Sequence, residues 1–158
     1  MNFRQALNTD KEAIWGILQQ AIHRRKQDGS QQWQDGYPNP ETVDKDIENK
    51  FGYVLEQDNE IIAYSALIPN YEPAYDTIEG EWLTQGEFLV VHRVAVSDQF
   101  LGRGMAKLVL QKIENHALIH NIPSIKLDTN FDNLAMLSIL NKLGYQYCGE
   151  VYFRGAAR

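Results

Sequence analysis

Two glycines, Gly102 and Gly104, stand where an apolar segment (residues 88–96) gives way to a long helical pattern. The first N–H groups of a helix have no partner within it, so they can bind an anion. Glycine adopts backbone angles that other residues avoid, and its lack of a side chain lets a phosphate come close. Strand, glycine turn and helix in this order indicate a site for a phosphorylated ligand.

Two common phosphate-binding motifs do not fit this turn. A dinucleotide fingerprint, Gly-x-Gly-x-x-Gly, would require glycine in place of Lys107. A P-loop would require Gly-x-x-x-x-Gly-Lys followed by Ser or Thr, and the sequence lacks this pattern. Arg103, inside the turn, could add a charge-assisted contact to a phosphate or could be a solvated turn arginine.

Size and charge narrow the class of protein. A chain of 158 residues fits a single domain, and 44% hydrophobic residues can fill its core. The net charge of −6 disfavours non-specific nucleic-acid binding and mildly favours cationic ligands. The N-terminal residues do not resemble a signal peptide, the single cysteine excludes an internal disulfide, and no uncharged stretch is long enough to cross a membrane. These features predict a cytoplasmic domain over residues 1–158.

Hydrophobic periodicity and turn residues predict alternating strands and helices. Thr9 and Glu12 fit a capping box for the first helix, and Asn39 with Pro40 begins the second. We expect strands over 2–6, 51–56, 60–68, 87–96, 124–128 and 145–153, and helices over 9–28, 39–50, 102–118 and 134–143. The irregular segment 70–86 has the length of a functional loop. Strand, helix and strand across 87–128 form a βαβ unit, so those two strands should be parallel.

The glycine turn belongs to a longer pattern. Residues 99–104 match Gln/Arg-x-x-Gly-x-Gly/Ala, the strand before them carries Val94-Ala95-Val96, and Asn133 begins a later helix that ends at Gly144-Tyr145. In these features the chain resembles the GNAT superfamily of acyl-CoA-dependent N-acetyltransferases. The resemblance implies an α/β fold with a mixed sheet of about six strands and helices on both faces. A seventh strand, common in the family, would be short or missing.

The resemblance also implies where acetyl-CoA binds. Backbone N–H groups of the turn would hold the pyrophosphate, and a β-bulge would separate the central strand from the strand at 124–128. Asn133 would bond the pantetheine arm, although its residue type equally suits a helix N-cap. The cofactor-binding residues implied are Val94, Ala95, Val96, Gln99, Leu101, Gly102, Arg103, Gly104, Met105, Ala106 and Asn133. Backbone donors on the central strand would stabilise the oxyanion.

The implied reaction is direct attack of an amine on the thioester, which requires a base. A lysine-like amine has a pKa of ~10.4, so its neutral form at pH 7 costs roughly 4–5 kcal/mol. His92 is the preferred base, on the expectation that it shares a strand face with Val94 and Val96, although it could be a hydrogen-bonded core histidine. Arg93 should point the other way and form a structural ion pair. Glu72, Glu79 and Glu81 are alternative bases, acting through a water.

The departing thiolate has less need of an acid. The family often has a tyrosine seven residues after the asparagine, but this chain has Leu140 there. Tyr145, or else Tyr147, could replace it, or the thiolate could take its proton from water. We assign Tyr145 as the candidate acid. His116 and His120 have the spacing of a zinc pair but lack the glutamate of His-Glu-x-x-His, so no metal is predicted.

Two loops are candidates for the acceptor site. Trp33 and Tyr37 lie between the first two helices, and Glu72 and Tyr75 lie in the segment 70–86. Aromatic rings and carboxylates can hold an ammonium group, although these residues could equally cover the edge of the sheet. The sequence therefore predicts acetyl transfer from acetyl-CoA to a primary amine of a small molecule or peptide.

Two other functional classes stay open at this point. Loss of the usual tyrosine would suit a non-catalytic acyl-CoA-binding regulatory module. A scaffold that dimerises through its last strand is the third reading, and a homodimer is also compatible with an enzyme.

Overall fold

A five-stranded mixed sheet organises the protein, for which a computed structural model describes residues 1–158. The strand order is β1-β2-β3-β5-β6, with every neighbouring pair antiparallel except β5 and β6, which are parallel as the βαβ pattern predicts. These strands span Asn2–Gln5, Gly52–Gln57, Glu60–Pro69, Leu89–Val96 and Ile125–Leu127. Strand β4 (Glu79–Gly80) lies outside this sheet and pairs with β7 (Gly149–Glu150).

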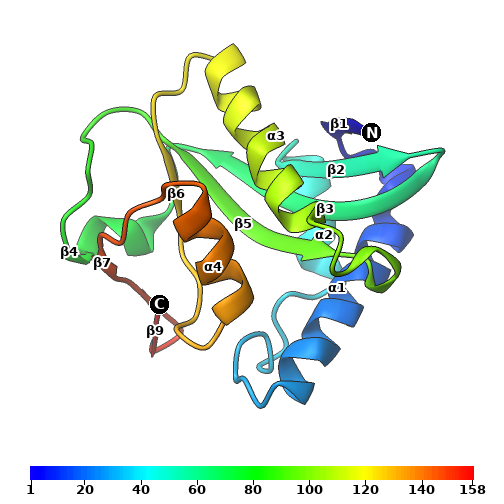
Figure 1. The fold of residues 1–158 in the computed structure, drawn as a ribbon, viewed down its shortest axis with the longest axis horizontal. Helices are drawn as coiled ribbons and strands as arrows, with labels where there is room; N and C mark the ends of the chain where they lie inside the picture. The colour runs from blue at the N-terminus through cyan, green and yellow to red at the C-terminus, as the bar shows by residue number, and fades with distance from the viewer.

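Helices cover both faces of the sheet, as the sequence predicts (Figure 1). On one face, α1 (Lys11–Gln27) and α2 (Pro40–Glu48) pack Ile14, Leu18 and Val43 against the sheet. On the other face, α3 (Met105–Ile119) contributes Val109, Leu110 and Ile113, and α4 (Leu134–Lys142) packs against the same cluster. Burial of these apolar side chains supplies the main driving force for folding. No helix is long and apolar enough to span a bilayer.

Strand β5 contains a β-bulge, the feature that the family resemblance implies. Tyr64 of β3 pairs with Ala95, but Ala66 pairs with His92, so Arg93 and Val94 together oppose one residue of β3. Arg93 has a φ of 57°, a left-handed conformation that is costly for a side chain with a Cβ atom. An extra residue of this kind bends the strand and changes the direction of the side chains that follow.

A buried ion pair holds the bulge in place. The Arg93 guanidinium donates to both carboxylate oxygens of Asp46 on α2, with an Nε–Oδ2 distance of 3.0 Å. The two side chains are only 7% and 6% exposed, and Tyr64 also donates to Asp46. Burial and the Asp46 carboxylate raise the pKa of Tyr64, which therefore stays protonated as a donor. The predicted structural ion pair of Arg93 is confirmed.

The prediction that His92 shares a face with Val94 and Val96 is wrong, because the bulge lies between them. Val94 and Val96 pack in the cluster of α3, and Ala95 packs in the cluster of α1 and α2. His92 instead contacts Tyr75 and Phe153, which belong to a third cluster around Val90. Strict alternation along the strand fails because one extra residue is inserted between His92 and Val94.

The ends of three elements also differ from the sequence predictions. Thr9 does not cap α1: Asp10 precedes the helix, and its carboxylate binds Arg4 and the Leu7 N–H. Helix α3 begins at Met105 rather than Gly102. Residues 145–153 do not form one strand; they contain only β7 and β8 (Tyr152–Phe153), which pairs with β9 (Ala156–Ala157).

The close approach of two glycines explains the altered C-terminal segment. Gly149 and Gly80 have φ of 144° and 147°, and a Cβ on either would lie less than 3 Å from the backbone of the other strand. Pairing with β4 thus draws β7 away from β6, which remains the edge of the main sheet.

We expect Arg93→Met to lower the free energy of unfolding by about 3–5 kcal/mol, because Asp46 would remain buried without its charged partner. Arg154→Met is a matched control, since Arg154 also has a positive φ and pairs with an aspartate, Asp35, but both side chains are exposed. Its effect should stay within about 1 kcal/mol. Chemical denaturation measures both variants, and equal losses would contradict the role given to the buried pair.

Candidate active site

The glycine turn between β5 and α3 presents free backbone donors. Gly102 and Gly104 have φ of 71° and 74°, and Gly104 lies directly before the helix. The first helical N–H group after the turn that has a backbone partner is that of Leu108, which donates to the carbonyl of Gly104, the residue that precedes α3. The N–H groups from Gly102 to Lys107 make no hydrogen bond within the protein. A Cβ at either glycine would meet open space, so the turn leaves room for a bulky anion.

Helix α1 fastens the start of this turn. Arg24 donates to the Val96 carbonyl and pairs with Asp98, and the Gln20 side chain accepts from the Asp98 N–H. Arg103 has no carboxylate partner, and its guanidinium lies 5.5 Å from the Phe100 ring. Its charge is therefore available to a ligand at the turn. Gln99 and Leu101 are exposed beside it.

A slot opens between β5 and β6 beyond the bulge. The last paired residues of these strands are Val91 and Leu127, after which β5 continues to Val96 bonded only to β3. Asn133 lies beyond the end of β6 and caps α4, its side-chain oxygen accepting from the Met136 N–H at 3.3 Å. The N-cap interpretation of Asn133 is thus confirmed, and its amide nitrogen makes no hydrogen bond within the protein.

His92, at the bulge, lies between two carboxylates. Its Nε2 is 2.8 Å from Glu72 Oε2, and its Nδ1 is 3.9 Å from Asp128 Oδ2. Burial opposes ionisation of Glu72, but the hydrogen bonds from His92 and the Ala74 N–H lower its pKa below the usual value. Glu72 is therefore an anion that can only accept, so Nε2 carries the proton. Nδ1 of a neutral His92 then holds a lone pair and faces Asp128 across a gap too wide for a hydrogen bond.

Tyr75 orders the second carboxylate. Its hydroxyl donates to Asp128 Oδ2 at 2.7 Å, and burial together with the Asp128 charge raises its pKa well above the usual value. The Tyr75 ring also contacts Trp82 and Phe153. Glu72 and Tyr75, both predicted for the acceptor site, are thus brought to His92 by the 3-10 helix Pro73–Thr77.

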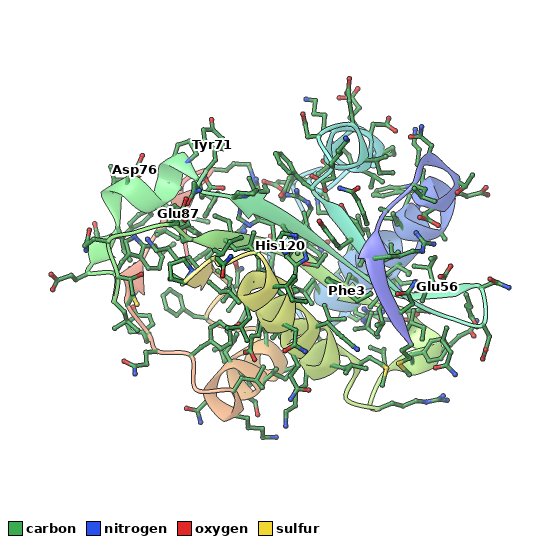
Figure 2. The ribbon with its side chains drawn as sticks, turned by 90° about the horizontal axis from the view of Figure 1, so that it is seen from above. Phe3, Glu56, Tyr71, Asp76, Glu87 and His120 are labelled. Atoms are coloured by element: carbon green, nitrogen blue, oxygen red, sulfur yellow. The ribbon has the colours of Figure 1, made fainter.

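The segment that supplies these residues lies at one end of the sheet. Figure 2 shows Tyr71, Asp76 and Glu87 gathered there, far from Phe3 and Glu56 at the opposite end. The C-terminal segment with β7 and β9 lies at the same end in Figure 1. Residues 71–87 and 149–158, distant in sequence, therefore build the surroundings of His92 together.

Trp33 and Tyr37 do not contact His92; they pack beside the α1 and α2 cluster and Arg93 instead. Trp33 packs on the cluster of α1 and α2, and the Tyr37 hydroxyl accepts from Arg93. Arg154 lies 4.3 Å from the Tyr37 ring and pairs with Asp35. The first acceptor loop is thus joined to the C-terminal hairpin and to the bulge.

Tyr145 faces a cavity of about 680 Å³ on the outer side of β6. Leu140 lines the same cavity, as do Lys126 of β6 and Asp128, which follows β6. Burial and the nearby Glu114 carboxylate raise the pKa of Tyr145, so its hydroxyl is protonated at neutral pH. No hydrogen bond or ring contact joins Tyr145 to His92.

His116 and His120 lie side by side on α3, with ring centroids 4.1 Å apart. His120 Nδ1 donates to the His116 carbonyl, and Tyr53 packs on the His116 ring. No group of three or more His, Cys, Asp or Glu side chains is arranged so that it could hold a metal ion.

Sequence reasoning missed Asp128, Phe153 and Arg158. Asp128 follows β6, and the carboxyl ends of parallel strands are where sites form, so this signal was present. Phe153 reaches His92 only because the C-terminal hairpin folds back over the site, with ring centroids 6.1 Å apart. No pattern in the sequence near Phe153 predicts that this hairpin folds back to His92.

Comparison with known proteins gives one consistent result. The model of the acetyltransferase (GNAT) family matches residues 17–145. An uncharacterized N-acetyltransferase, YesJ, of Bacillus subtilis (strain 168) is 30% identical over 146 residues, covering 91% of this chain and 81% of that protein.

Solved structures agree with this match. A GNAT-family acetyltransferase from Streptococcus agalactiae 2603 is 39% identical, with a TM-score of 0.90 over 99% of this chain and 91% of that one. A protein described as a predicted acetyltransferase from Clostridium acetobutylicum, solved with acetyl-CoA, shares the fold at 21% identity, with a TM-score of 0.61 over 92% and 90% of the two chains. The chain therefore belongs to the GNAT family of acetyltransferases.

Proposed function

We propose that this acetyltransferase moves the acetyl group of acetyl-CoA to a primary amine of a small molecule or peptide, with His92 as the base. The observation that carries the proposal is the position of His92. Its Nδ1 faces Asp128, at the point where β5 and β6 separate. A base, a carboxylate for an ammonium group and an open strand edge thus occur together.

The residues at the glycine turn fit the diphosphate of coenzyme A. Free N–H groups from Gly102 to Lys107, open space at both glycines and the unpaired charge of Arg103 all suit an anion. Val94, Ala95 and Val96 would lie beside the pantetheine arm, and the Asn133 amide nitrogen can donate to it. When bound, acetyl-CoA supplies the activated thioester that the amine attacks.

His92 would remove the proton that makes the acceptor amine unreactive. An ammonium group between Asp128 and His92 Nδ1 is attracted by the carboxylate and can pass its proton to Nδ1. Glu72, hydrogen-bonded to Nε2, fixes the tautomer and stabilises the imidazolium that forms. Tyr75 would hold Asp128 in position through its hydroxyl. Trp33 and Tyr37 would bind more distant parts of the acceptor.

Protonation of the departing thiolate makes a smaller demand. A thiol of pKa about 8.5 costs only about 2 kcal/mol to leave unprotonated at pH 7. Tyr145 stays our candidate acid, since its hydroxyl is protonated at neutral pH and it lines the same cavity as Leu140.

The oligomeric state and compartment are part of this proposal. The outer edge of β6 has no strand partner, and Leu118 and Ile119 of α3 are 74% and 76% exposed. Both features suit a homodimer. A single cysteine and the use of acetyl-CoA suit the cytoplasm.

We expect Gly104→Glu to weaken acetyl-CoA binding at least about tenfold, because a carboxylate would stand where the diphosphate docks. Gly29→Glu is a matched control: Gly29 has a φ of 77° and equal open space, but it follows the C-terminal end of α1 and so borders no helix N-terminus. It should bind as the unchanged protein does. Isothermal titration calorimetry measures both, and undiminished binding by Gly104→Glu would exclude the glycine turn as the diphosphate site.

We expect His92→Gln to lower kcat/KM about 10²- to 10⁴-fold and to remove the acid limb of the pH–rate profile. Glu72→Gln should lower kcat/KM by a smaller factor, because the imidazole loses the carboxylate that fixes its tautomer. Thiol release with an accepted amine provides the assay, and His120→Gln serves as the control.

An unchanged acid limb in His92→Gln would assign the base to another group. Tight acetyl-CoA binding without thiol release from any amine would instead favour the non-catalytic acyl-CoA-binding module.

A further inference from the structure

Arg158 has a largely buried guanidinium that makes no hydrogen bond within the protein. Its side chain is only 10% exposed, its guanidinium makes no hydrogen bond to the protein, and its Nε is buried without a partner. The nearest carboxylate oxygen, Asp128 Oδ1, is 3.8 Å from Nη1, which is a charge contact but too long for a hydrogen bond. A buried guanidinium normally uses several of its five donors.

The backbone holds this guanidinium in place. Arg158 and Val151 exchange two backbone hydrogen bonds of 2.8 Å, and Val151 is buried. The guanidinium carbon lies 5.3 Å from the Phe153 ring, the same ring that contacts His92. Arg158 is therefore a positioned donor group and not a solvated surface side chain.

Arg158 also faces space that a ligand can enter. It lines the cavity of about 680 Å³ together with Asp128, and Asp128 lies between Arg158 and His92. A positive, unbonded guanidinium thus stands one carboxylate away from the proposed base. The fork of an arginine matches the two oxygens of a carboxylate or phosphate.

We propose that Arg158 binds an anionic group of the acceptor, so that the substrate is an amine that also bears a carboxylate or phosphate close to its nitrogen. Asp128 and His92 then receive the ammonium group, and Arg158 receives the anion. A purely cationic acceptor such as a polyamine would place a second positive charge toward Arg158 and be disfavoured. This inference rests on the proposed acetyl transfer and adds the chemical class of its acceptor.

The test compares matched acceptors and matched variants. The acceptors are free amino acids, their carboxamides, aminoalkyl phosphates and polyamines, assayed by thiol release with acetyl-CoA. The variants are Arg158→Gln, Arg158→Lys and the control Lys11→Gln, which also removes one positive charge, but from an exposed ion pair with Asp44 outside the acceptor loops. Circular dichroism confirms that each variant folds.

The anion-bearing amines should be the better substrates, and Arg158→Gln should raise their KM about 10- to 100-fold. The same variant should leave the carboxamides unchanged, Arg158→Lys should recover part of the loss, and Lys11→Gln should resemble the unchanged protein. Preference for the amino acids or for the aminoalkyl phosphates identifies which anion is bound.

Turnover of polyamines or carboxamides in preference to anionic amines would overturn the assignment of Arg158, as would equal losses on charged and uncharged acceptors. Those outcomes leave acetyl transfer intact. Failure of every amine to release thiol, in protein that binds acetyl-CoA, would contradict both this inference and the proposed function.

Discussion

The bulge in β5, held by the buried pair of Arg93 and Asp46, is the constraint on which the rest of the site depends. One inserted residue separates two tasks along a single strand. Before it, His92 faces the acceptor segments; after it, Val94 and Val96 face α3. The bend also coincides with the point where β6 stops pairing, so the strand edge becomes free beside the base. The energetic cost of the left-handed conformation of Arg93 is offset by its contacts with Asp46.

Charge is distributed so that each end of the slot has a different partner. The glycine turn presents N–H dipoles and Arg103 to an anion, whereas His92 is flanked by Glu72 and Asp128. Although the net charge of the chain is −6, one end of the site therefore suits an anion and the other end suits a cation. Arg158 adds a positive group beside Asp128, and in our proposal it would let the site distinguish among amines by the charge they carry.

Sequence reasoning succeeded where the signal is local. The glycine turn, the parallel βαβ unit, the Asn39 cap and the pairing of Arg93 all follow from residue types a few positions apart. It failed where the outcome depends on a distant partner. The β3 residue that His92 opposes determines which face of the sheet the His92 side chain occupies. Residues 145–153 do not form one strand, because Gly149 pairs closely with Gly80. Asp128 carried a positional signal, but nothing near Arg158 or Phe153 links them to His92.

In our proposal, coenzyme A lies along the free edge of β5, with its diphosphate on the glycine turn and its thiol end near His92. A crystal structure of the protein with bound coenzyme A tests this most directly. We expect the diphosphate within hydrogen-bond distance of the N–H groups between Gly102 and Lys107, and the pantetheine arm beside residues 94–96. Coenzyme A bound away from the glycine turn, or a pantetheine arm directed away from His92, would contradict the account.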